Sequence, residues 1–309
     1  MADKPDDSTS TALARPMVAR DLDRAGKGQL VYVGHDGEVR DPADVRSKQA
    51  AAYAVFGGIT VAGVALAATS FPLLIPFYLA LGGRFLGTVR AVSQVNQASI
   101  ALSNGDALAG RALAEPVARA WWAPGRVRAL AELRVAIADA LEGKGAKALD
   151  RVRQARTRLS PRLIQHQFSY YTEINLLTSL GRTKEARVVL DARGPIPPGE
   201  VLKLSYWIAE LHLCCTEGAV PPGKVEESEL YDRMRKGLSM TAGRDLLLLC
   251  AWAYASRGEH DDARFAWRQA SDREGSQRLD IAMPALAAWM TTYLAAHPDL
   301  DEPDPDDET

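Results

Sequence analysis

The sequence predicts an all-α protein made of a helical-repeat solenoid of about five helix pairs, preceded by a transmembrane helical hairpin. Three observations predict this class. A long uncharged run interrupts a chain that is one quarter charged, and a glycine recurs about every 38 residues behind that run. The content of 47% apolar but only 7% aromatic residues is typical of helical proteins.

The chain begins with a segment that lacks the apolar core of a secretory signal, so we expect a flexible cytosolic tail over residues 1–28. A short cytosolic segment, residues 29–49, follows it. Alternating apolar residues flank Asp36 and Gly37 there, which is the pattern of a small β-hairpin near residues 29–41. A two-stranded hairpin is marginally stable alone, so we expect it to pack on another part of the chain.

The uncharged run lies between Lys48 and Arg84. As one helix it would be about 50 Å long, against roughly 30 Å of bilayer hydrocarbon. Pro72 and Pro76 offer a break in the middle. We therefore predict a transmembrane hairpin over residues 50–88 that contacts membrane lipid.

Basic residues stand on both sides of this run. Arg46 and Lys48 precede it, and Arg84 and Arg90 follow it. The positive-inside rule therefore predicts that both termini are cytoplasmic. Two alternatives remain open: a single tilted span, which would place the C-terminal part on the other side, and a buried helical hairpin inside a soluble core.

The repeated glycines are Gly105, Gly143, Gly181, Gly218 and Gly258, at spacings of 38, 38, 37 and 40. In the clearer units a small residue follows five positions later: Ala148, Ala186 or Ala263. A glycine suits the end of a first helix, and a small residue allows the second helix to pack closely on it. The fourth unit departs from the pattern because Pro221, Pro222 and Gly223 follow its glycine.

This pattern resembles the tetratricopeptide repeat (TPR) family, most closely where Gly258 is followed by Ala263, Trp267 and Ala270. The resemblance covers about residues 91–297, with a period longer than the usual 34, so the units would be TPR-like. It implies that the first helices of the pairs line a groove that holds partner segments. The implied groove residues are Ile137, Asn175, His212 and Trp252, six positions before each glycine, with Tyr171 from the preceding turn. Trp252 could equally belong to the core.

The end of the chain has two parts. A last apolar segment, residues 277–297, is expected to cover the final repeat, with a kink at Pro284. Residues 298–309 carry seven acidic groups and no basic one, so we expect an acidic disordered tail.

The sequence lacks several common catalytic motifs. It has no phosphate-binding glycine loop, no H-E-x-x-H and no G-x-S-x-G, and its five histidines are scattered. Cys214, Cys215 and Cys250 have no metal-ligand spacing, so we interpret them as buried free thiols. We expect no catalytic, cofactor-binding or metal-binding residue, no cofactor and no enzymatic activity.

Between Arg111 and Arg162 there are twelve basic residues against five acidic ones. The candidates for facing anionic lipid are Arg151, Arg153, Arg156, Arg158 and Arg162. A solvated helix surface and an acidic protein partner are the alternatives. Nucleic acid is not an expected partner, because the isoelectric point of the whole chain is about 6.2.

Together these features predict a membrane-tethered adaptor or scaffold that binds unknown protein partners through a TPR-like groove. One alternative is a structural membrane or pore-assembly component, a homo-oligomer formed through Gly58 and Ala62, which stand at small-xxx-small spacing. Another is a regulatory subunit of an enzyme complex.

Overall fold

The structure is a computed structural model. It describes residues 75–193, 199–220, 225–239, 243–271, 273 and 278–298, the short stretches 32–33 and 39–40, and several single residues between 47 and 62. The tail expected at 1–28 lies outside the described residues, as do all but the first residue of the tail expected at 298–309 and most of the run from 50 to 74.

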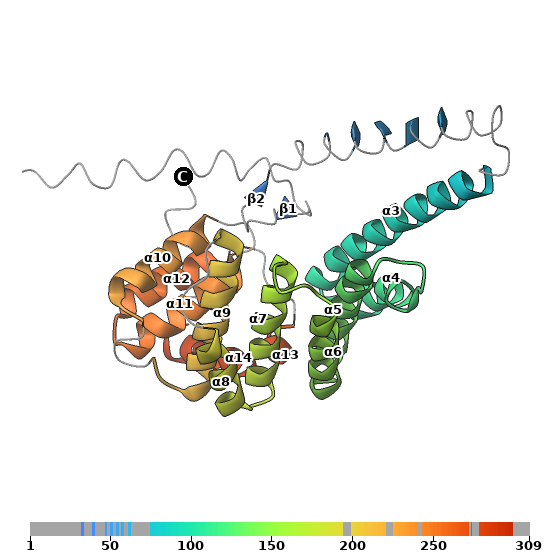
Figure 1. Cartoon of the computed structure of the whole chain (residues 1–309). Coiled ribbons are helices and arrows are strands. Elements are labelled where there is room, and N and C mark those ends of the chain that lie inside the picture. The colour runs from blue at the N-terminus through green and yellow to red at the C-terminus, as the bar shows by residue number, and fades with distance from the viewer. Residues whose placement is uncertain are drawn as a thin grey trace, which may run out of the picture.

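Helices dominate the described part of the chain, which confirms the all-α class (Figure 1). They are α3 (Ile75–Ser103), α4 (Ala107–Arg119), α5 (Gly125–Leu141), α6 (Gly145–Thr157), α7 (Ile164–Ser179), α8 (Thr183–Ala192), α9 (Glu200–Glu217), α10 (Glu227–Leu238), α11 (Arg244–Ser256), α12 (His260–Ser271), α13 (Leu279–Ala282) and α14 (Pro284–Ala296). Two short strands, β1 (Tyr32–Val33) and β2 (Val39–Arg40), pair antiparallel with Tyr32 opposite Arg40. The hairpin predicted near residues 29–41 is therefore present.

The five repeated glycines end the five first helices, as predicted. All five have a positive φ, between +72° and +81°, a region that costs other residues about 1–2 kcal/mol. After each glycine, the next N–H donates to the carbonyl five residues earlier, as from Lys144 to Asp139 and from Arg182 to Leu177, both at 2.8 Å. The same cap therefore closes α3, α5, α7, α9 and α11.

The small residues after the glycines lie where consecutive helices meet. Ala148, Ala186 and Ala263 are fully buried. Gly110 occupies the equivalent place in the first pair, where a Cβ atom would lie 2.5 Å from Cγ of Leu102. The fourth unit differs, as its sequence indicated, and its second helix, α10, packs against α11.

The first helices form one continuous row. α3 contacts α5, α5 contacts α7, α7 contacts α9, and α9 contacts α11. The final segment is two helices, because Pro284 begins α14. It returns along the row, since α13 contacts α5 and α7 while α14 contacts α9 and α11. We call the surface that α13 and α14 cover the inner face.

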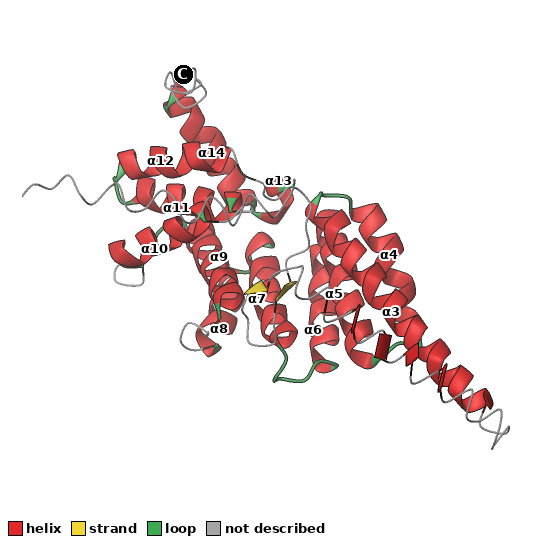
Figure 2. Ribbon diagram, turned by 90° about the horizontal axis from the view of Figure 1, so that it is seen from above, coloured by secondary structure: helices red, strands yellow, loops and turns green. Residues whose placement is uncertain are grey.

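Helix α3 has two different halves. Its second half buries Ala91, Val95 and Ala98. Its first half projects beyond the other helices in both views (Figures 1 and 2). The helix is continuous from Ile75 to Ser103, so the hairpin end expected at residue 88 falls inside it.

The membrane hairpin predicted over residues 50–88 is described only in part. Gly58 and Ala62 are described and exposed, and a Cβ placed on Gly58 meets no atom of another described segment within 4 Å. Of the helices that the structure describes, none combines the length and the apolar character needed to cross a bilayer.

Candidate functional site

Helix α5 shows how the inner face is built. Ala129, Leu133 and Ala136 belong to a buried cluster shared with α6 and α7, and Val127, Ala131 and Val135 belong to clusters on the side of α3 and α4. The remaining face carries Arg134, Ile137 and Leu141, which are three or four residues apart and half-buried. Because the other two faces of α5 pack on neighbouring helices, this third face lies on the inner side of the row.

Arg134 is a partly enclosed cation on this face. Burial lowers the pKa of its guanidinium. Its Nε has no hydrogen-bond partner among the described residues. Because a buried donor without an acceptor is costly, an acceptor supplied by another molecule would be favoured here.

A polar pair links α7 and α9 deeper in the same row. Nδ1 of His212 lies 3.2 Å from Oδ1 of Asn175. His212 is completely buried, and burial lowers its pKa from 6.5 to about 4. The imidazole is therefore neutral at pH 7, and with Nδ1 protonated it donates to the Asn175 amide oxygen.

The structure places the predicted groove residues in two groups. Tyr171, His212 and Trp252 are buried, and Trp252 lies in the core cluster around α11, so its alternative assignment to the core is correct. Ile137 and Asn175 are half-buried. The first group does not line an open groove, because neighbouring helices and the returning C-terminal segment enclose the row on both sides.

The C-terminal segment is held on the inner face by polar and apolar contacts. The Ser179 hydroxyl donates to the Ala282 carbonyl at 2.5 Å, across 103 positions of sequence. Met283 and Leu286 are buried in the cluster that contains residues of α9 and α11. The inner face therefore accepts a short helical segment with apolar side chains.

Buried carboxylates join successive helices. Asp139 of α5 is fully buried and pairs with Arg111 of α4 at 2.7 Å and Arg151 of α6 at 2.9 Å. Glu210 of α9 pairs with Arg233 of α10 at 2.6 Å. Breaking such a pair leaves an uncompensated buried charge, so each one fixes how its helices meet.

A third carboxylate, Glu173 of α7, binds two of the predicted lipid-facing arginines. It pairs with Arg153 at 2.6 Å and also with Arg156. The Arg156 guanidinium lies 3.7 Å above the centre of the Tyr170 ring. Arg156 is thus held within the protein by its carboxylate and ring contacts, whereas Arg153 pairs with Glu173 from an exposed position.

Three of the five arginines predicted to face lipid have carboxylate partners within the protein. Arg151, Arg153 and Arg156 form ion pairs with α5 and α7, and Arg153, Arg158 and Arg162 are the exposed side chains of this group. The stretch in which basic residues exceed acidic ones, from Arg111 to Arg162, ends before Glu173 and so does not include this carboxylate. The compensating carboxylates come from neighbouring helices in space.

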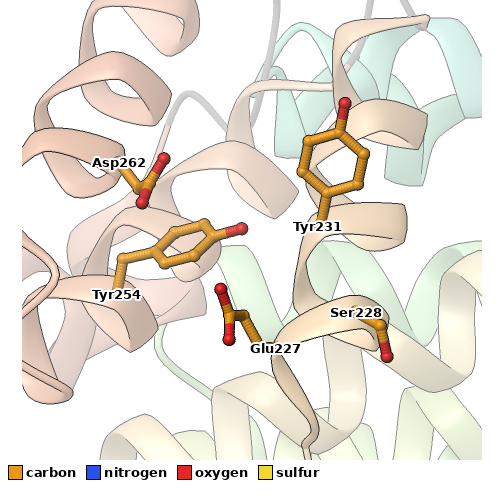
Figure 3. A pocket seen from close by; sticks show the side chains of 5 residues that line it. All are labelled: Glu227, Ser228, Tyr231, Tyr254 and Asp262. Atoms are coloured by element: carbon orange, nitrogen blue, oxygen red, sulfur yellow. The ribbon is translucent and has the colours of Figure 1, made fainter. Parts of the chain in front are cut away.

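A surface cleft of about 360 Å³ opens between α10, α11 and α12 (Figure 3). Its lining residues are Glu227, Ser228, Tyr231, Tyr254 and Asp262. In Figure 3 the Tyr254 ring lies between the carboxylates of Glu227 and Asp262. Burial, with the negative charges nearby, raises the pKa of Tyr254, so its hydroxyl stays protonated.

The acidic character of this cleft has a local explanation. Glu227 and Asp262 stand in the first turns of α10 and α12, where a carboxylate complements the helix dipole. No group of three or more His, Cys, Asp or Glu residues suited to a metal ion occurs among the residues that the structure describes.

The three cysteines are free and buried, as predicted. Burial raises the pKa of Cys215 and of Cys250 to about 12. Because the thiolate is the reactive form, these thiols are unreactive at neutral pH.

Comparison with known proteins finds no relative. No protein-family model, curated protein or solved structure matches the chain.

Proposed function

We propose that this protein is a membrane-tethered, non-enzymatic adaptor that binds a helical segment of a partner protein on a TPR-like inner face. The repeated glycine caps and the continuous row of first helices support the repeat assignment. In such an array, side-by-side helices give one extended surface for a partner.

The observation that carries the proposal is that α13 and α14 already pack along the inner side of the row, so a partner helix would bind beside them at the half-buried face of α5. The face already holds a helical segment through Met283, Leu286 and the Ser179 hydrogen bond. Recognition of an amphipathic helix by a groove uses the same apolar anchors at helical spacing. A partner helix with a carboxylate would in addition satisfy Arg134.

The membrane tether in this proposal is the uncharged run within residues 50–88. It is supported by sequence, through the absence of charge between Lys48 and Arg84 and the basic residues on both sides. The second helix of the predicted hairpin would continue into α3 and so connect the tether directly to the repeat domain.

The adaptor function can be tested with variants of the half-buried inner face, which are less disruptive than changes to its buried residues. We would purify the full chain in mild detergent with its bound proteins and compare two variants. One replaces Arg134, Ile137 and Leu141 by Ala. The control replaces Val188 and Phe265 by Ala, two exposed apolar side chains on the second helices α8 and α12.

We expect one partner protein to be retained by the wild type and the control and lost from the inner-face variant. Circular dichroism checks that all three proteins are equally helical. Retention of the partner by the inner-face variant together with its loss from the control would place the binding surface on the second helices and contradict the proposal.

A further inference from the structure

The first half of α3 presents apolar side chains that the described part of the chain does not cover. Leu79 and Leu86 are 61% and 68% exposed, and they lie on one side of the helix because they are seven residues apart. No charged residue occurs from Ile75 to Gly83. Such a surface is unfavourable in water by roughly 25 cal/mol per Å², and a contiguous one marks an interaction site.

Two tryptophans lie beside this surface. The connection between α4 and α5 carries Trp121 and Trp122, and Trp122 packs on α3 at Gly87, where a Cβ would lie 3.1 Å from its ring. Trp121 is 86% exposed. Tryptophan side chains are enriched at the level of lipid headgroups, because the ring is apolar and its N–H is polar.

The charged residues around the tryptophans are mainly basic. α3 contains Arg84 and Arg90 and no acidic residue, and the exposed Arg126 follows the tryptophans at the start of α5. Arg84 and Arg90 each stand three residues from Gly87, about 4.5 Å along the axis. An arginine side chain can bridge that distance to a headgroup.

We propose that Gly87, Trp121 and Trp122 mark the level of the bilayer surface on this protein. The part of α3 that precedes Gly87 enters the apolar layer, the tryptophans lie among the headgroups, and Arg90 and Arg126 contact anionic lipid. The entering part, residues 75–86, is about 18 Å long, which covers only part of the roughly 30 Å hydrocarbon core.

An anionic bilayer fits this surface better than a second protein copy. The uncharged run of the sequence, residues 49–83, extends into α3, so the apolar surface is continuous with it. The basic residues complement anionic headgroups but would repel the same residues of a second copy. This inference rests on the membrane attachment in the proposed function.

The test is quenching of tryptophan fluorescence in vesicles of phosphatidylcholine and phosphatidylglycerol whose acyl chains carry bromine near the headgroup. The full chain is reconstituted and its flotation with the vesicles is measured first. We expect strong quenching in the wild type, and loss of most of it when Trp121 and Trp122 are both changed to Phe. The control Trp289→Phe changes a residue that packs against Tyr293 in α14 and should leave the quenching unchanged.

The outcomes separate this inference from the proposed function. If the chain floats with the vesicles but the double variant is quenched as strongly as the wild type, the tryptophans do not lie at the bilayer surface and only this inference fails. A chain that does not float would overturn both the inference and the membrane tether. Dimerisation that buries Trp121 without quenching by lipid would assign the surface to a second copy.

Discussion

Helix α11 and the first half of α3 are both apolar in sequence, yet they have opposite surroundings. Nine consecutive residues of α11, from Leu246 to Tyr254, are buried, because α9, α10, α12 and α14 all contact or share a core with this helix. The first half of α3 has Trp122 beside it and remains exposed. An apolar run therefore predicts that a segment will be covered, but the covering material can be the chain itself or something outside it.

The largest expected loss of stability comes from breaking the ion pair between α9 and α10, two helices that both contact α11. Glu210→Ala would leave Arg233, which is only 1% exposed, without its partner at 2.6 Å. We expect the free energy of unfolding to fall by about 3–5 kcal/mol. Urea denaturation of the detergent-solubilised protein measures it.

The matched control for this prediction is Glu185→Ala, which removes an exposed pair with Arg182 at 2.7 Å. That change should lower the free energy of unfolding far less, because exposed ion pairs are screened by solvent. Similar losses in the two variants would show that the Glu210 pair does not hold α9 against α10 as described.

A second prediction compares the two apolar segments directly. Leu249→Ala removes a fully buried side chain from α11 and should lower the free energy of unfolding by about 3 kcal/mol, because a cavity remains. Leu86→Ala in α3 should change it by less than about 0.5 kcal/mol in detergent. A large loss from Leu86→Ala would mean that the chain itself covers the first half of α3.

Part of this fold could be predicted from the sequence because its signals are local. A glycine at a helix end needs only its own backbone conformation, and all five predicted glycines have it. The small residues Ala148, Ala186 and Ala263 are likewise buried where close helix packing requires them. Such features depend on neighbours within one helical turn or one hairpin.

Other features could not be predicted because they depend on segments distant in sequence. The burial of Tyr171 and His212 follows from the assembled row and from a C-terminal segment that returns to α7, as the contact of Ser179 with Ala282 shows. Arg153 forms its ion pair with Glu173, which lies on the following helix. A charge count along one stretch of sequence does not contain that pairing.

The buried histidine gives a pH-dependent prediction for the interior of the row. The pKa of His212 is about 4 in the folded protein and 6.5 in the unfolded chain, so the unfolded state binds more protons between these values. The contribution of His212 to the free energy of unfolding is then fully present above pH 6.5 and decreases as the pH falls. At pH 5 it is lower by about 2 kcal/mol.

The variant His212→Asn isolates this contribution, since other groups also titrate in acid. The loss of stability between pH 7 and pH 5, measured by urea denaturation, should be smaller in the variant by about 2 kcal/mol. An unchanged pH dependence would mean that His212 is not enclosed in the folded protein.

The smallest expected effect tests the helix caps. Gly181→Ala places a Cβ in open space but at a φ of +72°, so we expect a loss of about 1–2 kcal/mol from backbone strain alone. A Cβ at Gly125, the first residue of α5, would also lie in open space, but the φ of this residue is not positive. Gly125→Ala should therefore stabilise the protein by up to about 1 kcal/mol. Thermal unfolding distinguishes the two signs.

The most direct test of the central claim, that the exposed half of α3 is covered by lipid, is cysteine accessibility along this helix. Leu79, Leu86, Ser93 and Gln97 are all exposed in the protein alone, and the three native cysteines are buried. Each position is changed to Cys in the full chain, reconstituted in vesicles and treated with a water-soluble maleimide. We predict that positions 79 and 86 are protected and that positions 93 and 97 react. Equal reactivity at all four positions would contradict the account.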